Sequence, residues 1–281
     1  MLRALAALPL PLFHGVGVIL GWTVWLLSPR FRRLTRDNLA TAGYDSPEIV
    51  RRSVAETGKS ALEIIPVWFR PQDDVAALLQ VDDDILRMVD RLQSAGKGII
   101  FVTPHLGCFE VTAQWYASRR GPMTALFSPP KKGVMDYLIR TGRQKSNLRL
   151  AAPGMRGMRS LIRALKAGEA VGILPDQVPG PGEGQWAPFF GRPAYTMTLV
   201  QRLAAMTGAP VVVAYAERLP AGRGYRAAAE SMPEALPGES AARHLNRAME
   251  NLIRRCPAQY LWSYNRYKVP AGVESPGGAG A

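Results

Sequence analysis

Short apolar runs that alternate with longer helical segments are the feature that most constrains how this chain can fold. The runs have the length and composition of buried strands, and they cover residues 99–103, 123–127, 170–174 and 210–216. The helical patterns around them cover residues 46–69, 73–79, 84–95, 110–117, 136–141, 158–167 and 196–207. Strands separated by helices favour parallel pairing, because each parallel strand needs a crossover before the next. The sequence therefore predicts an α/β fold, with a mostly parallel sheet covered by helices on both faces.

Length and charge narrow the class of protein. The 281 residues suffice for one large α/β domain with a substantial core. Lys and Arg number 35 against 22 Asp and Glu, a formal net charge of +13. Such a surplus indicates a polyanionic partner, which nucleic acid, anionic lipid headgroups or a phosphorylated cofactor would each satisfy. Cys108 and Cys256 lie far apart without metal-ligand spacing, so we expect a reducing compartment, no disulfide scaffold and no zinc site.

The amino terminus favours lipid among these partners. Residues 4–29 contain no Asp, Glu, Lys or Arg, and these 26 residues exceed the roughly 20 that cross a hydrocarbon core. Trp22 and Trp25 lie toward the far end of this run, and a cluster of arginines follows it, as is typical of a cytoplasmic membrane interface. We therefore predict a transmembrane or membrane-anchoring helix within residues 1–30, a folded domain over 31–270 and a flexible tail over 271–281.

Three other interpretations of the apolar run stay open. Prolines and glycines within it weaken the helix and leave room for a half-buried or hairpin-like anchor. A buried core helix has the same composition. A cleaved signal peptide fits less well, because the positive cluster follows the apolar run and no small-residue cleavage site separates them.

His105 and Glu110 stand where the first predicted strand ends and the next helix begins. Ligands bind at this end of the strands in open α/β sheets, in the crevice lined by loops and helix N-termini. An imidazole oriented there by a carboxylate can take a proton from a hydroxyl. The pair is therefore a candidate general base, with Glu110 holding the tautomer of His105. Cys108 lies between them, and we interpret it as a small buried thiol rather than a covalent nucleophile.

Three further segments carry polar groups near the predicted strand ends. The stretch 140–147 is a basic loop whose Arg140, Arg143 and Lys145 could bind phosphate, or could form a solvated surface. Asp176 and Gln177 directly follow a predicted strand, where a loop-stitching role is as plausible as a chemical one. Thr196 is placed at the start of the last predicted helix, whose N-terminal amides would then face the same crevice.

Several of these motifs together resemble a known family, the late acyltransferases of lipid A biosynthesis within the lysophospholipid acyltransferase superfamily. The resemblance runs from the apolar segment to about Pro270. It rests on the order and spacing of His105-x4-Glu110, Pro175-Asp176-Gln177, Phe189-Phe190-Gly191 with Ala194 and Thr196, and Gln259-Tyr260-Leu261-Trp262 with Arg266 and Lys268. One position departs from the pattern, because relatives often have a His where this chain has Tyr264.

The resemblance implies an enzyme of the bacterial inner (plasma) membrane that works at the cytoplasmic face. It would move an acyl chain from acyl carrier protein to a hydroxyl of a phosphorylated glycolipid, a lipid A precursor, with neither cofactor nor metal. His105 and Glu110 would be the catalytic pair. The expected substrate-binding residues are Arg140, Arg143, Lys145, Asp176, Gln177, Thr196 and Arg266.

Two rival functions have their own discriminating features. An acyltransferase for a lysophospholipid, an aminolipid or another glycolipid would share all the motifs and differ only in its acceptor pocket. A non-enzymatic basic protein that binds membranes or nucleic acid would not need a His–acid pair at a strand end. Nucleic-acid binding would also favour basic patches interleaved with exposed aromatic residues, so we expect no nucleic-acid partner.

Overall fold

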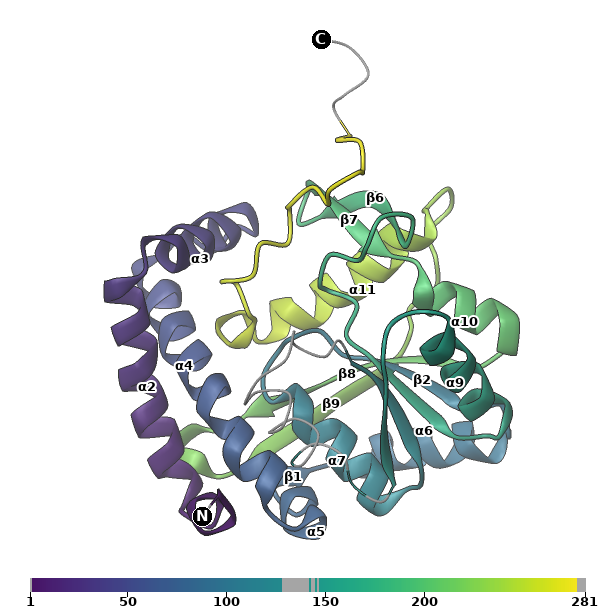
Figure 1. Ribbon diagram of the computed structural model, residues 1–281, viewed down its shortest axis with the longest axis horizontal. Helices are drawn as coiled ribbons and strands as arrows, with labels where there is room; N and C mark the ends of the chain where they lie inside the picture. Colours follow the sequence, from purple (N-terminus) through teal and green to yellow (C-terminus); the bar gives the residue numbers. More distant parts are fainter. Residues whose placement is uncertain (1, 128–141, 143–144, 146, 277–281) are drawn as a thin grey trace.

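A seven-stranded sheet forms the centre of the protein in the computed structural model, which describes residues 2–127, 142, 145 and 147–276 (Figure 1). In the order of the sheet, its strands are β1 (Leu79–Gln80), β9 (Tyr225–Ser231), β8 (Val211–Arg218), β2 (Ile99–Val102), β5 (Ala170–Ile173), β3 (Met123–Leu126) and β4 (Leu148–Ala151). All neighbours pair in parallel except β8 and β9, which are antiparallel. The predicted α/β fold with a mostly parallel sheet is confirmed.

Helices cover both faces of this sheet. They are α1 (Leu2–Ala6), α2 (Leu10–Leu27), α3 (Pro29–Thr41), α4 (Pro47–Phe69), α5 (Gln72–Ala76), α6 (Asp83–Ser94), α7 (Phe109–Arg119), α9 (Met155–Lys166), α10 (Leu199–Thr207) and α11 (Ala241–Arg255). Two short 3₁₀ turns, η1 (Pro220–Gly222) and η2 (Pro257–Gln259), follow β8 and α11.

The alternation of side chains along β2 shows which helices cover which face. Ile99 packs into a cluster with residues of α6 and α7, whereas Ile100 packs into the larger cluster with residues of α9, α10 and α11. Successive side chains of a strand point to opposite faces, so a strand covered on both faces is apolar throughout. This double burial explains why the short strands read as unbroken apolar runs in the sequence.

The structure corrects the sequence prediction around residue 196. Thr196 lies on a strand and not at a helix start, because β6 (Gly184–Phe189) and β7 (Arg192–Met197) form an antiparallel hairpin and α10 begins only at Leu199. Phe190 and Gly191 form the two-residue turn, with φ of 47° and 78°. Positive φ at both turn positions matches the twist of a hairpin, although it is uncommon for a residue such as Phe190.

Other departures are smaller. The helix predicted over 73–79 ends at Ala76, and Leu79 starts the edge strand β1. The helix predicted over 136–141 lies outside the described residues. Strands β4 and β9 and helix α11 were not predicted. The predicted strands over 99–103, 123–127, 170–174 and 210–216 correspond to β2, β3, β5 and β8.

The apolar amino-terminal segment forms α2, which lies antiparallel along α4 (Figure 1). Within the described part of the chain, α2 is the one helix long and apolar enough to cross a membrane. Its inner face packs backbone to backbone on α4, because a Cβ atom at Gly58 would lie 1.9 Å from the carbonyl oxygen of Gly17. Its outer face exposes large apolar side chains, with Ile19 67 % and Leu27 78 % exposed.

Candidate active site

His105 and Asp176 meet where two neighbouring parallel strands end. His105 follows β2 by three residues, Asp176 follows β5 by three, and β2 and β5 pair in register. The backbone amide of His105 donates to Asp176 Oδ2 at 2.9 Å, and the imidazole Nδ1 lies 2.8 Å from Asp176 Oδ1. Both carboxylate oxygens are therefore used to hold one residue, which fixes the backbone and the ring of His105 together.

This contact sets the protonation of the imidazole. A carboxylate at Nδ1 favours the tautomer in which Nδ1 carries the proton and Nε2 is the free acceptor. The side-chain amide of Gln177 lies 3.2 Å from Nε2, where it can donate. His105 therefore presents an unprotonated Nε2, the atom that a general base needs.

Asp176 is kept ionised by its surroundings. Burial by itself raises the pKa of this carboxyl, but the charge and hydrogen bonds of His105, followed by the charge of Arg266, lower it below its usual value overall. Tyr260 lies on the same side, and burial, followed by the charge of Asp176, raises its pKa well above the usual range. An anionic Asp176 is suited to orient the imidazole and to stabilise an imidazolium.

The carboxyl-terminal Gln259–Trp262 motif braces the His105 turn. Leu106 and Tyr260 form an antiparallel bridge, and the amide of Leu261 donates to the His105 carbonyl at 3.0 Å. Gly107 has φ of 59°, and a Cβ atom there would lie 1.9 Å from the Ala216 carbonyl oxygen. Only glycine fits at this position, where the turn is pressed against β8.

A cavity of about 600 Å³ opens beside His105. His105, Glu110 and Gln177 line it together with Arg202 of α10. The rest of its wall is mostly apolar, and includes Ile64, Trp68, Leu126, Phe127, Met155, Met158, Leu161, Leu174, Val178, Met197 and Leu199. A second cavity of about 60 Å³ lies on the α6–α7 side of the sheet and shares Phe109, Glu110 and Leu174 with the first. A mostly apolar pocket with a few convergent polar groups is the usual form of a small-molecule site.

Glu110 lies in the first turn of α7, is 6 % exposed and lines the cavity with His105. The sequence assigned the tautomer-holding role to Glu110, and either loop stitching or substrate binding to Asp176. The hydrogen bond at Nδ1 corrects the tautomer-holding role, because Asp176 makes it. Substrate binding by Asp176, which does not line the large cavity, stays a prediction. Spacing along the chain could not reveal the His105–Asp176 contact, because the two residues are 71 positions apart in the sequence. They meet only because β2 and β5 are neighbours in the sheet.

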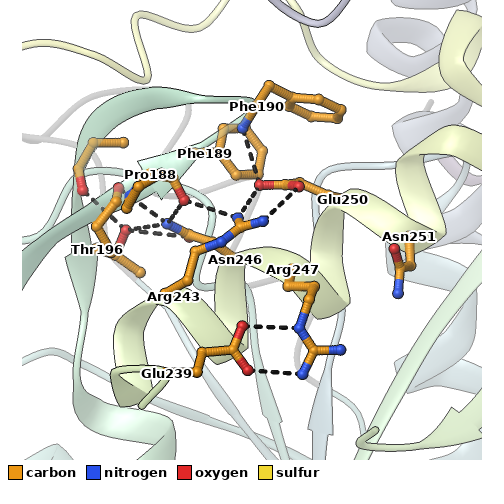
Figure 2. A network of polar contacts seen from close by, with 12 residues as sticks. Pro188, Phe189, Phe190, Thr196, Glu239, Arg243, Asn246, Arg247, Glu250 and Asn251 are labelled. Carbon is orange, nitrogen blue, oxygen red and sulfur yellow. Dashed lines mark hydrogen bonds and ion pairs between the residues drawn. The ribbon is translucent and has the colours of Figure 1, made fainter. Parts of the chain in front are cut away.

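Thr196 and Arg266, two of the expected substrate-binding residues, are buried in a polar network away from the cavity. Thr196 is 0 % exposed and Arg266 2 %. Arg266 donates to the Tyr195 carbonyl and to Thr196 Oγ1, both at 2.7 Å, and Asn246 of α11 bonds Thr196 at 2.9 Å (Figure 2). Neither side chain is free to meet a substrate, so their assignment is corrected to holding the β6–β7 hairpin on α11.

The predicted phosphate-binding loop is only partly described. Arg140 and Arg143 lie outside the described residues. Lys145 donates to the Trp68 carbonyl at 2.8 Å, and burial, followed by the charge of Arg3, lowers its pKa. Tyr264, the position that departs from the family pattern, accepts the Val178 amide at 3.0 Å and so fixes the loop that follows Gln177.

Comparisons with known proteins agree with this architecture. The family model described as bacterial lipid A biosynthesis acyltransferase matches residues 1–269. The chain belongs to this family. It is 28 % identical to the lipid A biosynthesis lauroyltransferase of Escherichia coli (strain K12) over 278 residues, which covers 95 % of this chain and 89 % of that protein. It is 27 % identical to the palmitoleoyltransferase of the same organism over 277 residues, with the same coverage.

A third relative from that organism, the lipid A biosynthesis myristoyltransferase, is 27 % identical over 188 residues, or 65 % of this chain and 57 % of the relative. The protein is therefore an acyltransferase of lipid A biosynthesis, and the resemblance found in its motifs is confirmed. Among the described residues of this acyltransferase, no group of three or more His, Cys, Asp or Glu side chains could hold a metal ion. Arg202 is a cavity residue that the sequence analysis missed, because none of the recognised motifs includes it.

Proposed function

We propose that this acyltransferase moves a fatty acyl chain from acyl carrier protein to a hydroxyl of a lipid A precursor, with His105 as the general base. One observation carries the proposal: Asp176 fixes Nδ1 of His105, which leaves Nε2 directed at the side where the large cavity lies. A thioester is already activated, so the reaction needs a base for the attacking hydroxyl and donors for the oxyanion, without a covalent enzyme nucleophile.

In the first step, the acceptor hydroxyl takes the place of the Gln177 amide at Nε2. Its proton passes to Nε2 as its oxygen forms a bond to the thioester carbon, and the carbonyl electrons move onto oxygen. The Gln177 amide, released from the imidazole, is then available to donate to that oxyanion, together with N–H groups in the first turn of α7. Asp176 stabilises the imidazolium through Nδ1.

In the second step the oxyanion re-forms the carbonyl and the carbon–sulfur bond breaks. The leaving thiolate takes the proton back from Nε2, which returns His105 to its starting state. We assign Glu110 a supporting role, because its buried carboxylate on the cavity wall adds negative charge beside the developing imidazolium. The apolar wall of the cavity would hold the acyl chain, and the small cavity behind Phe109 would extend that space.

We also propose that α2 anchors the enzyme at the cytoplasmic leaflet of the inner membrane without crossing it. A spanning α2 would carry α4 into the bilayer, because the two helices pack antiparallel, with Ala6 bound to Arg70 and Gly21 against Val54. The adjoining α4 surface includes charged Glu56 and Lys59, which lipid would not solvate. A helix lying in one leaflet buries only its exposed apolar face.

A flotation assay tests this anchor. Ile19→Glu combined with Leu27→Glu should release the protein from vesicles that contain anionic lipid, while Leu236→Glu, which changes an exposed leucine on a distant loop, should not. Accessibility of the amino terminus to a membrane-impermeant reagent from the outer face of the bilayer would contradict a one-leaflet anchor.

The acyl-transfer proposal is tested with the purified full chain in detergent. Acyl carrier protein carrying chains of 10 to 16 carbons is supplied with lipid A precursors or with lysophospholipids, and products are identified by mass. We expect acylated lipid A precursor from the parent and almost none from His105→Ala. Preferential acylation of the lysophospholipid would instead assign a different acceptor, and equal activity of His105→Ala would overturn the mechanism.

A further inference from the structure

Helices α9 and α11 are both strongly basic, and they differ in whether nearby carboxylates pair with their cations. On α11, arginines are matched by nearby carboxylates: Arg243 binds Glu250 and Arg247 binds Glu239 (Figure 2). Arg254 also binds Glu250, and Arg255 binds Glu230. On α9, the exposed cations are Arg156, Arg159, Arg163 and Lys166, and the helix contains no Asp or Glu. No hydrogen bond or ion pair joins the side chains of these four cations to any residue that the structure describes.

The four α9 cations, here called the α9 ridge, form one row. Their spacing of three, four and three residues places them on a single face of a helix. The opposite face is apolar, and Leu161 and Leu165 are fully buried against the sheet. The 12 residues of α9 extend about 18 Å, so the ridge is a line of like charges that repel each other with no internal compensation. The fold itself gains nothing from this arrangement.

The α9 ridge begins at the large cavity. Gly154, Met155 and Met158, at the amino-terminal end of α9, line the cavity that holds His105. Arg202 of the neighbouring α10 lines it as well and adds a fifth exposed cation beside the ridge. Met155 is 70 % exposed, so an apolar side chain stands between the ridge and the opening. A partner bound along the ridge would reach the cavity past this end of the helix.

The position of the α9 ridge favours a protein partner over a membrane surface. The exposed apolar face of α2 lies at one side of the molecule, whereas α9 lies toward the opposite side of its longest axis (Figure 1). A ridge for lipid headgroups would be expected beside α2. Nucleic acid is disfavoured too, because α9 carries no aromatic side chain on which a base could stack.

We propose that the α9 ridge docks an acidic acyl carrier protein and directs its thioester past Met155 into the cavity. This inference rests on the proposed function, from which it takes the donor. Unpaired cations at the rim of a binding site speed association with an acidic partner and make it salt-dependent. Carboxylates along a surface of the carrier would supply the charges that α9 lacks.

The test is the variant Arg159→Glu/Arg163→Glu in the full chain, with two donors of the same chain length. One donor is dodecanoyl-loaded acyl carrier protein, and the other is the uncharged dodecanoyl thioester of N-acetylcysteamine. With the carrier, we expect KM to rise about tenfold or more and its salt dependence to weaken, with kcat nearly unchanged. With the uncharged thioester, the variant should match the parent, which also shows that it is folded.

Two control variants sharpen this result. Arg119→Glu/Arg226→Glu changes the net charge equally at exposed positions on α7 and β9 and should leave KM for the carrier unaltered. Arg159→Lys/Arg163→Lys should retain most of the carrier affinity.

Three outcomes would overturn the inference. An unchanged carrier KM in the ridge variant would show that the ridge does not dock the carrier. A raised KM for the lipid acceptor with both donors would assign the ridge to acceptor phosphates instead. If the parent enzyme used the free thioester but not the acyl carrier protein, the proposed donor would be wrong. The proposed acyl-transfer chemistry would still hold.

Discussion

Two histidines in this enzyme are each paired with a buried carboxylate, and only one pair has the arrangement of a catalytic site. His105 bonds Asp176 through Nδ1, which leaves Nε2 beside Gln177 and the cavity. His14 of α2 directs Nε2 at Glu63 of α4 from 3.5 Å, in a region where Arg218 and Tyr225 also bind Glu63. The Asp176 carboxylate therefore orients a histidine, whereas the Glu63 carboxylate mainly pairs with an arginine.

The difference shows what a His–carboxylate pair needs in order to act as a base. At His105, the carboxylate orients the ring, and the other nitrogen lies beside Gln177, another residue of the cavity wall. At His14, the charge of Glu63 is already balanced by Arg218, which also binds Glu56 at 2.6 Å. That cluster joins α2, α4 and β8, and its effect is on stability. Substitutions at the His105–Asp176 pair should therefore lower activity, and substitutions at the Glu63 cluster should lower stability.

The largest expected effect is on catalysis. His105→Ala should lower kcat by about 10² to 10⁴, because it removes the general base, while the thermal unfolding midpoint stays close to that of the parent. The matched control, His14→Ala, should retain activity. Equal loss of activity in the two variants in the acyl-transfer assay would contradict the assignment of catalysis to His105 alone of the two histidines.

The next effect is on stability. Arg218→Met should lower the free energy of unfolding by about 3–5 kcal/mol, because it leaves Glu63 buried without its cation. Urea unfolding followed by tryptophan fluorescence measures this loss. The double variant Glu63→Leu/Arg218→Leu removes both charges and should recover part of it. Equal stability of Arg218→Met and the parent would show that the cluster contributes little.

The Glu63 cluster also predicts how stability depends on pH. Burial raises the pKa of Glu63, but the charge and hydrogen bonds of Arg218, followed by those of His14, lower it overall to about 2 from an ordinary 4.5. A lowered folded-state pKa stabilises the protein above pH 4.5, and this stabilisation of roughly 3 kcal/mol is lost as the pH falls toward 2. In urea unfolding between pH 2 and 7, Glu63→Gln should flatten this part of the profile. Glu48→Gln, at an exposed position, should leave it intact.

A smaller effect on catalysis should follow from Asp176→Asn. The amide can present an N–H group to Nδ1, which would move the imidazole proton to Nε2 and block proton abstraction. We expect kcat to fall by about 10², with KM nearly unchanged, because Asp176 does not line the large cavity. Steady-state kinetics at saturating acyl donor measure the two constants. A rise in KM without a fall in kcat would return Asp176 to the substrate-binding role that the sequence suggested.

Local signals in the sequence were sufficient for much of the fold. The apolar runs gave β2, β3, β5 and β8 because strands buried on both faces must be apolar throughout. Helix α4 was predicted to begin near Ser46, whose hydroxyl accepts the Ile49 amide as an N-cap. Strand β9 was missed because it lies antiparallel on β8, and most of its residues are only partly buried.

The sequence by itself determined the α/β class, the apolar helix and the histidine at a strand end, because each depends on residues close together in the chain. Only the tertiary structure decided which carboxylate serves His105. Parallel pairing of β2 and β5 brings Asp176 to Nδ1, although Glu110 is nearer in sequence. It also decided that Arg266 and Thr196 are buried and that no described carboxylate pairs with the cations of α9, because the burial and pairing of a charge depend on segments distant in the chain.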